Sequence, residues 1–401
     1  MVTLLQDLRY GLRMLTKNPG FTAVALLTLA LGIGANTAIF TVVYGVLFQP
    51  LPYPDSERMV EITRTERGQV ADYNGFTAGA FDFWYQHHEP FQSLAAFTGG
   101  GFSLTGAGTP ERIRALRVSS EYFSVYGVEP FLGRSFSRDE DQDGGPNVAV
   151  LSYQLWKAHF DGDQRAIGRT VLLDGVPFTV IGVMPEGFAS IPPATLWTTI
   201  AQVRHTIGGG QNYGIIGRLK AGVSQERATA YLAALAVPFI TEYYSWMKES
   251  NRKHISFAAA PYRYMISNDV RLPLLVLFGA IGFVLLTACV NVANLLLART
   301  AARNREIALR SALGAGRART ARQLLTESVL LGVFGAAAGL LVAYWGLHSL
   351  LALAPADLPR AGQVALNGWA LLFTSGLAVL TGLLFGLAPA VSVGRVDLNE
   401  S

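Results

Sequence analysis

The sequence predicts a membrane protein with four transmembrane α-helices and a large α+β extracytoplasmic domain inserted between the first and second helices. Three observations support this fold class. The mean hydropathy is +0.32 and only 15% of the 401 residues are charged, whereas roughly 25% are charged in soluble domains. Four long stretches contain no Asp, Glu, Lys or Arg. A basic segment separates the second stretch from the third, as expected for a cytoplasmic loop.

The chain begins with a short amphipathic segment, residues 1–20, in which Arg9, Arg13 and Lys17 outnumber Asp7. A basic flank of this kind stays in the cytoplasm. The first predicted span follows at 21–48. Its uncharged run is longer than the roughly 20 residues needed to cross a bilayer and the roughly 7–15 of a signal-peptide core. We therefore predict an uncleaved membrane anchor.

Residues 49–271 are predicted to form the extracytoplasmic domain, which is nearly neutral, with 20 Lys/Arg and 22 Asp/Glu. Sequence patterns indicate strands at 112–118, 147–151 and 215–219, and helices at 119–126, 152–160 and 224–236 that each begin with a capping serine. Asp174-Gly175 lies between two β-rich runs and predicts a type I′ hairpin turn. The pattern of strands and helices restarts at Tyr213, so residues from about 127 to 205 are predicted to be an inserted subdomain.

The other three spans are predicted at 272–298, 328–354 and 369–392. They alternate with a cytoplasmic loop at 299–327, a short extracytoplasmic loop at 355–368 and a cytoplasmic C-terminus at 393–401. Outside the domain the chain has 12 Lys/Arg and 6 Asp/Glu, an excess that the positive-inside rule explains. The charge pattern does not resemble a nucleic-acid-binding groove. The only cysteine, Cys289, lies in an apolar run, so an intramolecular disulfide is excluded.

Small residues recur at four-residue spacing in three of the spans. The pairs are Gly34 and Ala38, Gly335 and Gly339, and Gly382 and Gly386. Such pairs allow helices to pack closely, within a chain or in a dimer, although Gly and Ala are frequent in transmembrane helices in any case. Asn291 and Asn294, near the inner end of the second span, either form hydrogen bonds between helices or are solvated at the interface.

The basic loop at 299–327 contains seven arginines, and its acids are Glu306 and Glu327. Apolar residues from Ile307 to Leu313 recur at spacings of three to four, which predicts an amphipathic helix along the membrane surface. Gly314 and Gly316 then end it. The stretch REIALRSALGAGRARTARQLLTES is similar to the loop between the second and third spans of FtsX-like permeases.

Sequence motifs for catalysis or cofactor binding are absent. None of the five lysines follows a glycine, so the chain lacks the phosphate-binding GxxxxGK[ST] loop. Neither a GxSxG nor an HExxH motif occurs. We therefore predict that the chain is not an enzyme, has no catalytic or metal-binding residue and binds no cofactor itself. Any ATP and Mg²⁺ are expected on a partner ATPase.

Two segments resemble metal sites. In the first, Asp139, Asp141 and Asp143 imitate the start of a calcium-binding EF-hand loop, but Val150 stands where that loop needs a bidentate Glu. A solvated acidic turn is the prediction there. The second is His87-His88-Glu89. Adjacent histidines on a helix point about 100° apart and are poor co-ligands, so an exposed helix end is predicted.

Three stretches together resemble a known family. They are NPGFTAVALLTLALGIGANTAIFTVVYGVLFQPLPYPDSERMV, GRSFSRDEDQDGGPNVAVLSYQLWKAHF and VNVANLLLARTAARNREIALRSALGAGRARTARQLLTESVLLG. The chain is similar to MacB-type ABC transporter permeases with a MacB-like periplasmic core domain, in particular to one half of the acidobacterial duplicated orphan permeases. The MacB enzyme carries its ATPase on the same chain, a point at which this sequence departs from it.

The resemblance implies a multi-pass protein of the bacterial inner membrane with both termini in the cytoplasm. The implied partners are a separate ABC ATPase, membrane lipid, a second permease half in a homodimer or heterodimer, and in some systems a periplasmic adaptor. Six residues match the coupling loop: Arg303, Arg305, Glu306, Arg310, Gly314 and Arg317. The arginines also fit simple positive-inside topology and lipid phosphate contact, whereas topology gives no reason for an acid at Glu306.

Three functions follow as hypotheses. The first is a permease subunit of the mechanotransmission type, which couples ATP hydrolysis on a partner to motion of its periplasmic domain for efflux or export. The second is an FtsX-like scaffold that regulates a periplasmic or cell-wall partner without transport. The third is a tethered periplasmic enzyme, which predicts a pocket with convergent titratable groups.

Overall fold

The computed structural model describes residues 9, 11, 13–71, 75–105, 110–201, 212–302, 317–353 and 364–394. The chain divides into two compact units. The helical unit comprises Met1–Gln49 and Asp269–Ser401, and the extracytoplasmic domain comprises Pro50–Asn268.

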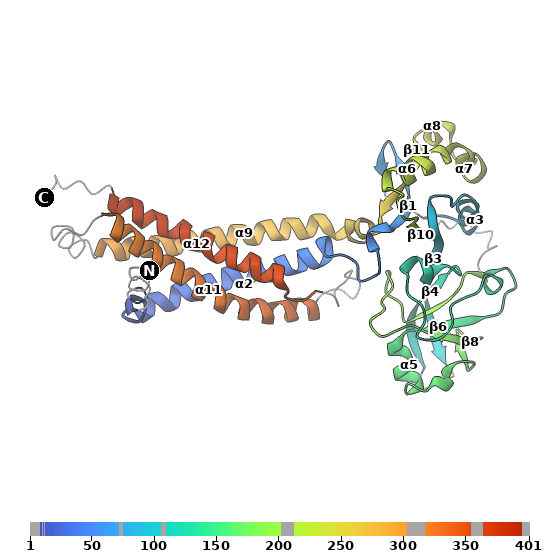
Figure 1. Ribbon diagram of the computed structural model, residues 1–401, viewed down its shortest axis with the longest axis horizontal. Coiled ribbons are helices and arrows are strands. Elements are labelled where there is room, and N and C mark those ends of the chain that lie inside the picture. Colours follow the sequence, from blue (N-terminus) through green and yellow to red (C-terminus); the bar gives the residue numbers. More distant parts are fainter. Residues whose placement is uncertain are drawn as a thin grey trace. The chain divides into compact units, whose positions relative to one another are not determined.

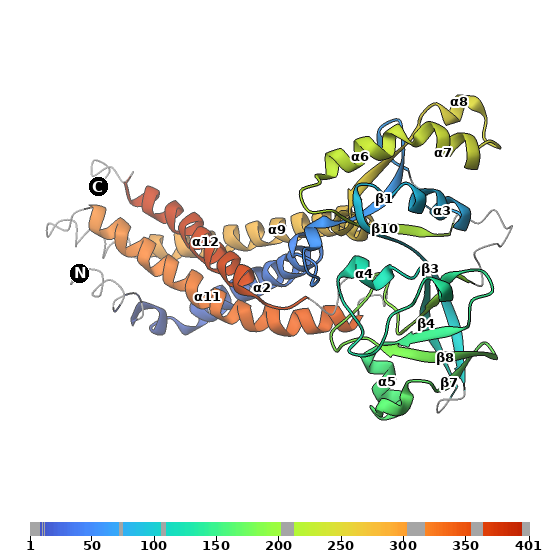
Figure 2. The ribbon, with the colours of Figure 1, turned by 45° about the vertical axis from the view of Figure 1, so that its right-hand side comes forward.

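Long helices make up the helical unit, and successive helices run in opposite directions (Figures 1 and 2). They are α2 (Pro19–Val43), α9 (Tyr262–Ala302), which begins within the domain, α11 (Arg317–Leu353) and α12 (Gly368–Gly394). A π-helical turn, η1 (Tyr44–Phe48), extends α2. Within the described residues, three segments are long and apolar enough to cross a membrane: Pro19–Phe48, Tyr262–Ala298 and Leu325–Leu350. The apolar stretch of α12, Gly368–Leu384, is shorter.

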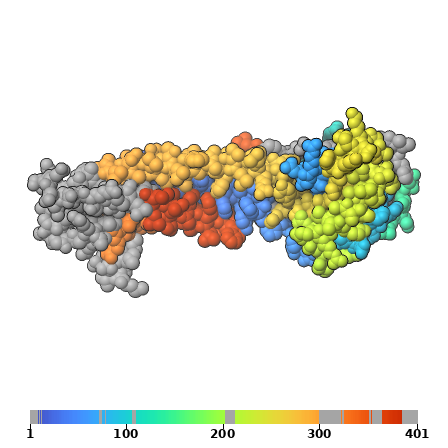
Figure 3. All heavy atoms as spheres, turned by 90° about the horizontal axis from the view of Figure 1, so that it is seen from above, coloured from blue at the N-terminus to red at the C-terminus, as the bar shows by residue number. Residues whose placement is uncertain are grey.

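The helices differ in how much of their apolar surface the unit covers. In α2 the residues that face inward include Leu29 and Ile33, which are fully buried. Helix α9 instead lies along one face of the unit (Figure 3), and its Leu272 and Phe283 are 70% and 72% exposed. Apolar side chains can remain on such a face because lipid is as apolar as they are.

Exposed aromatic residues gather at the end of the unit where α2 and α11 finish and α12 begins. They are Phe48, Tyr344, Trp345 and Trp369, each at least 53% exposed. Tyrosine and tryptophan, whose rings are amphipathic, concentrate at the membrane–water interface. Their position indicates one boundary of the membrane.

The extracytoplasmic domain is built from eleven described strands and six short α-helices, with three additional 3₁₀ turns. The strands are β1 (Met59–Glu66), β2 (Gln69–Val70), β3 (Phe91–Thr105), β4 (Glu111–Val118), β5 (Leu132–Gly133), β6 (Val148–Leu151), β7 (Thr170–Leu173), β8 (Val176–Val183), β9 (Leu196–Thr199), β10 (Gly214–Leu219) and β11 (Ile255–Pro261). The helices are α3 (Ala78–Gln86), α4 (Tyr122–Tyr126), α5 (Tyr153–Phe160), α6 (Gln225–Ala234), α7 (Ala236–Tyr243) and α8 (Glu249–Arg252).

All these strands join one sheet, in the order β11-β1-β10-β3-β4-β9-β6-β8-β5, with β2 beside β1 and β7 beside β3 and β8. The β4–β9 and β6–β8 pairs are parallel and the others antiparallel. Strands β5 to β9 come from the segment 127–205, which was predicted as an insertion. They continue the sheet of the flanking parts through the pairing of β4 with β9 and of β3 with β7.

Three hydrophobic cores lie against this sheet. The first surrounds Trp84 and Phe239, where α3, α6 and α7 pack on β1, β10 and β11, and these elements lie together in Figures 1 and 2. The other two lie on opposite faces of the inserted strands. Successive residues of β6 alternate between them, because side chains of a strand point to opposite faces: Val150 joins the core around Phe123 and Trp197, and Leu151 joins the core around Trp156.

Several local sequence signals are confirmed, and the start of one predicted helix is wrong. Asp174 and Gly175 have φ of 50° and 82° between β7 and β8, which confirms the type I′ hairpin. Ser152 and Ser224 cap α5 and α6 as predicted. The helix predicted from Ser119 is wrong in its start: α4 begins at Tyr122, and the Ser119 hydroxyl accepts the Ala96 N–H. This hydrogen bond connects the segment just before α4 with β3.

Candidate functional site

The predicted coupling segment falls mostly outside the described residues. Arg303, Arg305, Glu306, Arg310 and Gly314 all lie there. Arg317 is the first residue of α11. Contact of this segment with an ATPase therefore stays a prediction.

Four of the six small residues predicted for helix packing, Gly34, Gly335, Gly339 and Gly382, lie at contacts between helices of the same chain. A Cβ atom added to Gly34 of α2 would lie 2.7 Å from the Gly339 carbonyl oxygen of α11, and one added to Gly335 would lie 2.7 Å from the Leu29 Cβ. Between α11 and α12, a Cβ on Gly382 would lie 3.0 Å from the Val329 Cα. Ala38 is buried, and Gly386 lies in α12. A role for these residues in a dimer stays a prediction.

Polar side chains also join the helices, and the sequence did not single them out. The Asn36 amide of α2 donates to the Gly32 carbonyl at 2.9 Å and to the Ile281 carbonyl of α9 at 3.1 Å. The hydroxyls of Thr37 and Thr374 lie 2.9 Å apart and connect α2 with α12. Each of these three residues is at most 3% exposed. By contrast, Asn291 and Asn294 are both exposed on α9.

A buried tyrosine cluster lies where the chain enters and leaves the extracytoplasmic domain. Tyr53 follows the first helix and donates to the Ala189 carbonyl. Tyr262 begins α9 and donates to the Ile191 carbonyl. Both segments are therefore hydrogen-bonded to the same loop of the inserted subdomain, at residues 189–191. We call this loop and the tyrosines bonded around it the junction cluster.

Helix α4 completes the junction cluster with Tyr122 and Tyr126. The Tyr126 hydroxyl donates to the Ile191 carbonyl at 3.2 Å and lies 3.0 Å from the Tyr262 hydroxyl and 3.2 Å from that of Tyr122. The Ile191 N–H in turn donates to Tyr126. Burial raises the pKa of Tyr122 and Tyr126, so these hydroxyls stay neutral and can donate.

A buried arginine also holds the entry segment. Arg218 of β10 is only 3% exposed. Its guanidinium donates to the Val125 carbonyl of α4 at 3.0 Å and to the carbonyls of Pro54 and Asp55 at 2.8 and 3.3 Å. Burial, reinforced by Arg58, lowers the pKa of Arg218, but an arginine remains charged. Backbone carbonyls thus fix a cation between the entry segment and α4.

The acidic turn is not solvated as predicted, because two of its acids are buried. Glu140 is 7% exposed and accepts two bonds from the Arg134 guanidinium, at 2.6 and 2.8 Å. Asp141 is 3% exposed and accepts the Ser120 N–H at 3.0 Å. The Arg134 guanidinium lowers the pKa of Glu140. Asp141 thus anchors the loop to the segment just before α4, whereas Glu140 closes the loop on itself.

The histidine pair lies at the end of α3. His87 follows its last residue, and the side chains of His87 and His88 contact the Phe83 and Tyr85 carbonyls. Among the described residues, no group of three or more His, Cys, Asp or Glu is arranged to hold a metal ion.

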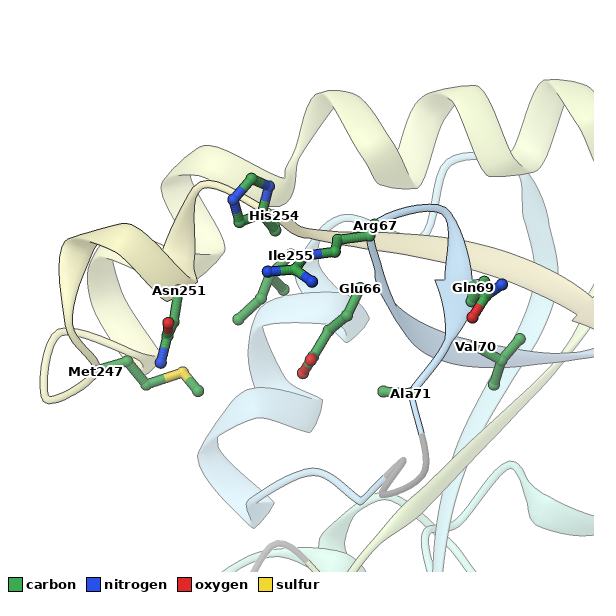
Figure 4. Close-up of a pocket in the computed structure, with 9 residues that line it drawn as sticks. All are labelled: Glu66, Arg67, Gln69, Val70, Ala71, Met247, Asn251, His254 and Ile255. Carbon is green, nitrogen blue, oxygen red and sulfur yellow. The ribbon is translucent and has the colours of Figure 1, made fainter.

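One pocket, of about 440 Å³, is lined by Glu111, Arg112, Arg114 and His159 among others. Another pocket, of about 430 Å³, brings titratable side chains together at the turn between β1 and β2 (Figure 4). Its lining includes Glu66, Arg67 and His254. The described lining contains no Ser, Thr or Cys, the side chains that most often act as nucleophiles.

Two family descriptions match most of the chain. Residues 22–235 match the MacB-like periplasmic core domain, and residues 278–398 match the FtsX-like permease C-terminal region. The first match alone covers more than half of the sequence.

Among known proteins, the macrolide export ATP-binding/permease protein MacB of Salmonella typhi is 27% identical over 299 residues, covering 71% of this chain and 42% of its own length. The protein of that name from Neisseria gonorrhoeae is 26% identical over 319 residues, covering 76% and 46%. The chain thus spans less than half the length of these relatives.

Two solved structures are also similar. The periplasmic region of MacB from Actinobacillus actinomycetemcomitans has a TM-score of 0.40 and 17% identity, over 57% of this chain and 95% of its own. The extracellular domain of the ABC-type transporter YknZ from Gram-positive bacteria has a TM-score of 0.38 and 15% identity, over 50% and 98%.

Proposed function

Because the chain belongs to the family of MacB-like permeases with an FtsX-like C-terminal region, we propose that it is the permease subunit of an ABC transporter of the mechanotransmission type. In this role it couples ATP hydrolysis on a separate ATPase to motion of its extracytoplasmic domain, for efflux or export. It lies in the bacterial inner membrane with both termini in the cytoplasm.

The junction cluster is the observation that carries this proposal. Two chain segments connect the helical unit with the domain, and Tyr53 and Tyr262 bind both of them to the loop at 189–191. Arg218 adds bonds from the entry segment to α4. Hydrogen bonds in a low-dielectric interior are strong, and breaking one leaves a costly unpaired group. A displacement of either segment would therefore move the inserted subdomain with it.

The energy for this motion is proposed to come from a partner. The sequence has no phosphate-binding loop, so ATP and Mg²⁺ would bind to the ATPase subunit. We assign the contact with the ATPase to Arg303, Arg305, Glu306, Arg310, Gly314 and Arg317. Charge-assisted pairs between the charged residues of this set and the ATPase would set the orientation of the two proteins as well as their affinity. The chain would act beside a second permease half, identical or different, and with a periplasmic adaptor in systems that have one.

The first experiment tests the ATPase contact. The full chain is reconstituted in lipid with the MacB-type ATPase encoded in its own genome, and the rate of ATP hydrolysis is measured. We expect the wild-type chain to change that rate and the Glu306→Arg variant to lose the effect. Glu249→Gln is the matched control, because Glu249 is an exposed acid of the extracytoplasmic domain. Equal behaviour of wild type and Glu306→Arg would contradict the assignment.

The second experiment tests transmission. A fluorophore on Glu186→Cys, in a Cys289→Ala background, reports on the inserted subdomain. With the ATPase present, ATP should change its fluorescence in the wild type. A double variant, Tyr126→Phe with Tyr262→Phe, should keep the effect on hydrolysis but lose the fluorescence change. If the fluorescence change persists in the double variant, the junction cluster does not transmit the motion to the inserted subdomain.

The scaffold function has a different signature. Capture of a cell-wall hydrolase by the full chain, without any effect on an ATPase, would favour it.

A further inference from the structure

The pocket at the turn between β1 and β2 has a mixed set of binding groups. It is formed by the β1–β2 turn, the start of β11, α8 and Met247, which precedes α8 (Figure 4). Its lining residues are Glu66, Arg67, Gln69, Val70, Ala71, Met247, Asn251, His254 and Ile255. Five of these are polar or charged and four are apolar, so the pocket is more polar than the mostly apolar pockets that hold drug-sized ligands.

The backbone fixes the cationic side of this pocket. Arg67 and Gly68 have φ of 52° and 81°, the left-handed values of a tight turn. The Arg67 N–H donates to the His254 carbonyl at 3.1 Å and so joins the turn to the strand opposite. Arg67 and His254 are exposed, and within the described chain neither side chain takes part in an ion pair. Both are available to a ligand.

The anionic side is Glu66. In Figure 4 its carboxylate lies among the lining side chains, with Arg67 above it and Met247 and Asn251 across from Ala71. Arg64 pairs with Glu66 at 3.2 Å, yet the Glu66 side chain remains 48% exposed. A carboxylate next to the Arg67 guanidinium repels a dianion such as phosphate and favours a ligand that carries an ammonium group as well.

We propose that this pocket binds a small zwitterion, either a free α-amino acid or a short peptide. The ligand carboxylate pairs with Arg67, and the amides of Asn251 and Gln69 and the imidazole of His254 supply further hydrogen bonds. The ligand ammonium pairs with Glu66. An aliphatic side chain of the ligand packs on Met247 and Ile255. This site is independent of the proposed transport role.

Binding of L-leucyl-L-leucine to the full chain in nanodiscs tests the proposal. Titration calorimetry should show saturable binding with a Kd on the order of 0.1–1 mM, the range expected for a ligand of this size. Amidation of the ligand carboxylate and acetylation of its amine should each weaken binding by about tenfold or more. Free L-leucine, run in parallel, distinguishes the two ligand types: equal affinity indicates an amino acid, and weaker affinity a peptide.

Variants locate the site. Arg67→Gln should weaken binding by about tenfold or more, and because Arg67 is exposed the variant should keep the wild-type melting temperature. Lys253→Gln is the matched control, because Lys253 is an exposed neighbour that pairs with Glu249 and does not line the pocket. It should bind like the wild type. Absence of saturable binding to the wild type, or unchanged binding by Arg67→Gln, would overturn the proposal.

Discussion

At the scale of single residues, buried polar groups fix the segments that lead into and out of the domain. Arg218 and the tyrosines of the junction cluster donate hydrogen bonds to backbone carbonyls. These carbonyls need side-chain donors because no neighbouring strand of the described chain supplies an N–H to them. The carbonyls of Ala189, Ile191, Val125 and Pro54 are all satisfied in this way. The local backbone therefore depends on a few side chains.

Arg218→Met should destabilise the extracytoplasmic domain by about 2 kcal/mol, because methionine fills the space but leaves carbonyls without donors. Thermal unfolding of the full chain in detergent, followed by tryptophan fluorescence, measures the loss. Arg227→Met is the control, since Arg227 is exposed on α6 and its replacement should be nearly neutral. The same melting temperature for both variants would show that the Arg218 bonds contribute little.

Glu140 should make stability depend on pH. Its pKa in the folded state is lowered by Arg134 from an ordinary value of 4.5, so its contribution is complete above that value and is lost as the pH falls through the folded-state pKa. Glu140→Gln should cost about 1–2 kcal/mol at pH 7 and should flatten the decline of stability as the pH falls below the ordinary pKa of 4.5. Parallel pH profiles for variant and wild type would rule this out.

At the scale of elements, small residues set how closely the helices approach. Gly34→Val should force α2 away from α11, because its Cβ would lie 2.7 Å from the Gly339 carbonyl oxygen. We expect a melting temperature several degrees lower in detergent, a loss of about 1–3 kcal/mol. Gly279→Val is the control, since no atom lies within 4 Å of a Cβ there, and it should retain wild-type stability. Equal losses would point to helix propensity rather than to packing.

The boundaries of elements could be predicted where a residue type has a single common role in local structure. Asp174-Gly175 fits a type I′ turn whatever surrounds it, and Ser152 and Ser224 cap the helices that follow them. Ser119 looks identical in the sequence, but its hydroxyl serves Ala96 on a neighbouring strand. The prediction that Glu140 and Asp141 are solvated was wrong for a similar reason. Their partners Arg134 and Ser120 come close to them only when the loop is folded.

At the scale of the whole molecule, hydropathy and charge predicted the division into helices and domain, but not the site. The membrane-spanning helices could be predicted because a long uncharged run is recognised from composition alone. The junction cluster instead joins residues as distant as Tyr53 and Ala189, or Tyr126 and Tyr262. Tyrosine is an ordinary core residue, so no sequence signal marked this set. The strand order could not be predicted either, because it depends on non-local pairs such as β4 with β9.

The proposed topology can be tested by labelling. In a Cys289→Ala background, Glu186→Cys should react with a membrane-impermeant maleimide on intact spheroplasts, because it is exposed in the domain and predicted to lie outside the cytoplasm. Ser401→Cys should react only after permeabilisation. Labelling is read by mass shift on a gel. The reverse pattern would invert the assigned orientation.

The pairing of β4 with β9 has a consequence for the order of folding. Val118 and Thr199 are direct partners in this pair, so an inserted subdomain that folds first brings its own two ends together. For β10 to reach β3, where Gly214 pairs with Phe97, the chain must close a long loop, and the entropy lost on closure grows with loop length. Folding of the insertion removes residues 119–198 from that loop. Because the insertion also leaves the ribosome before β10, the domain can assemble from its middle outwards during synthesis.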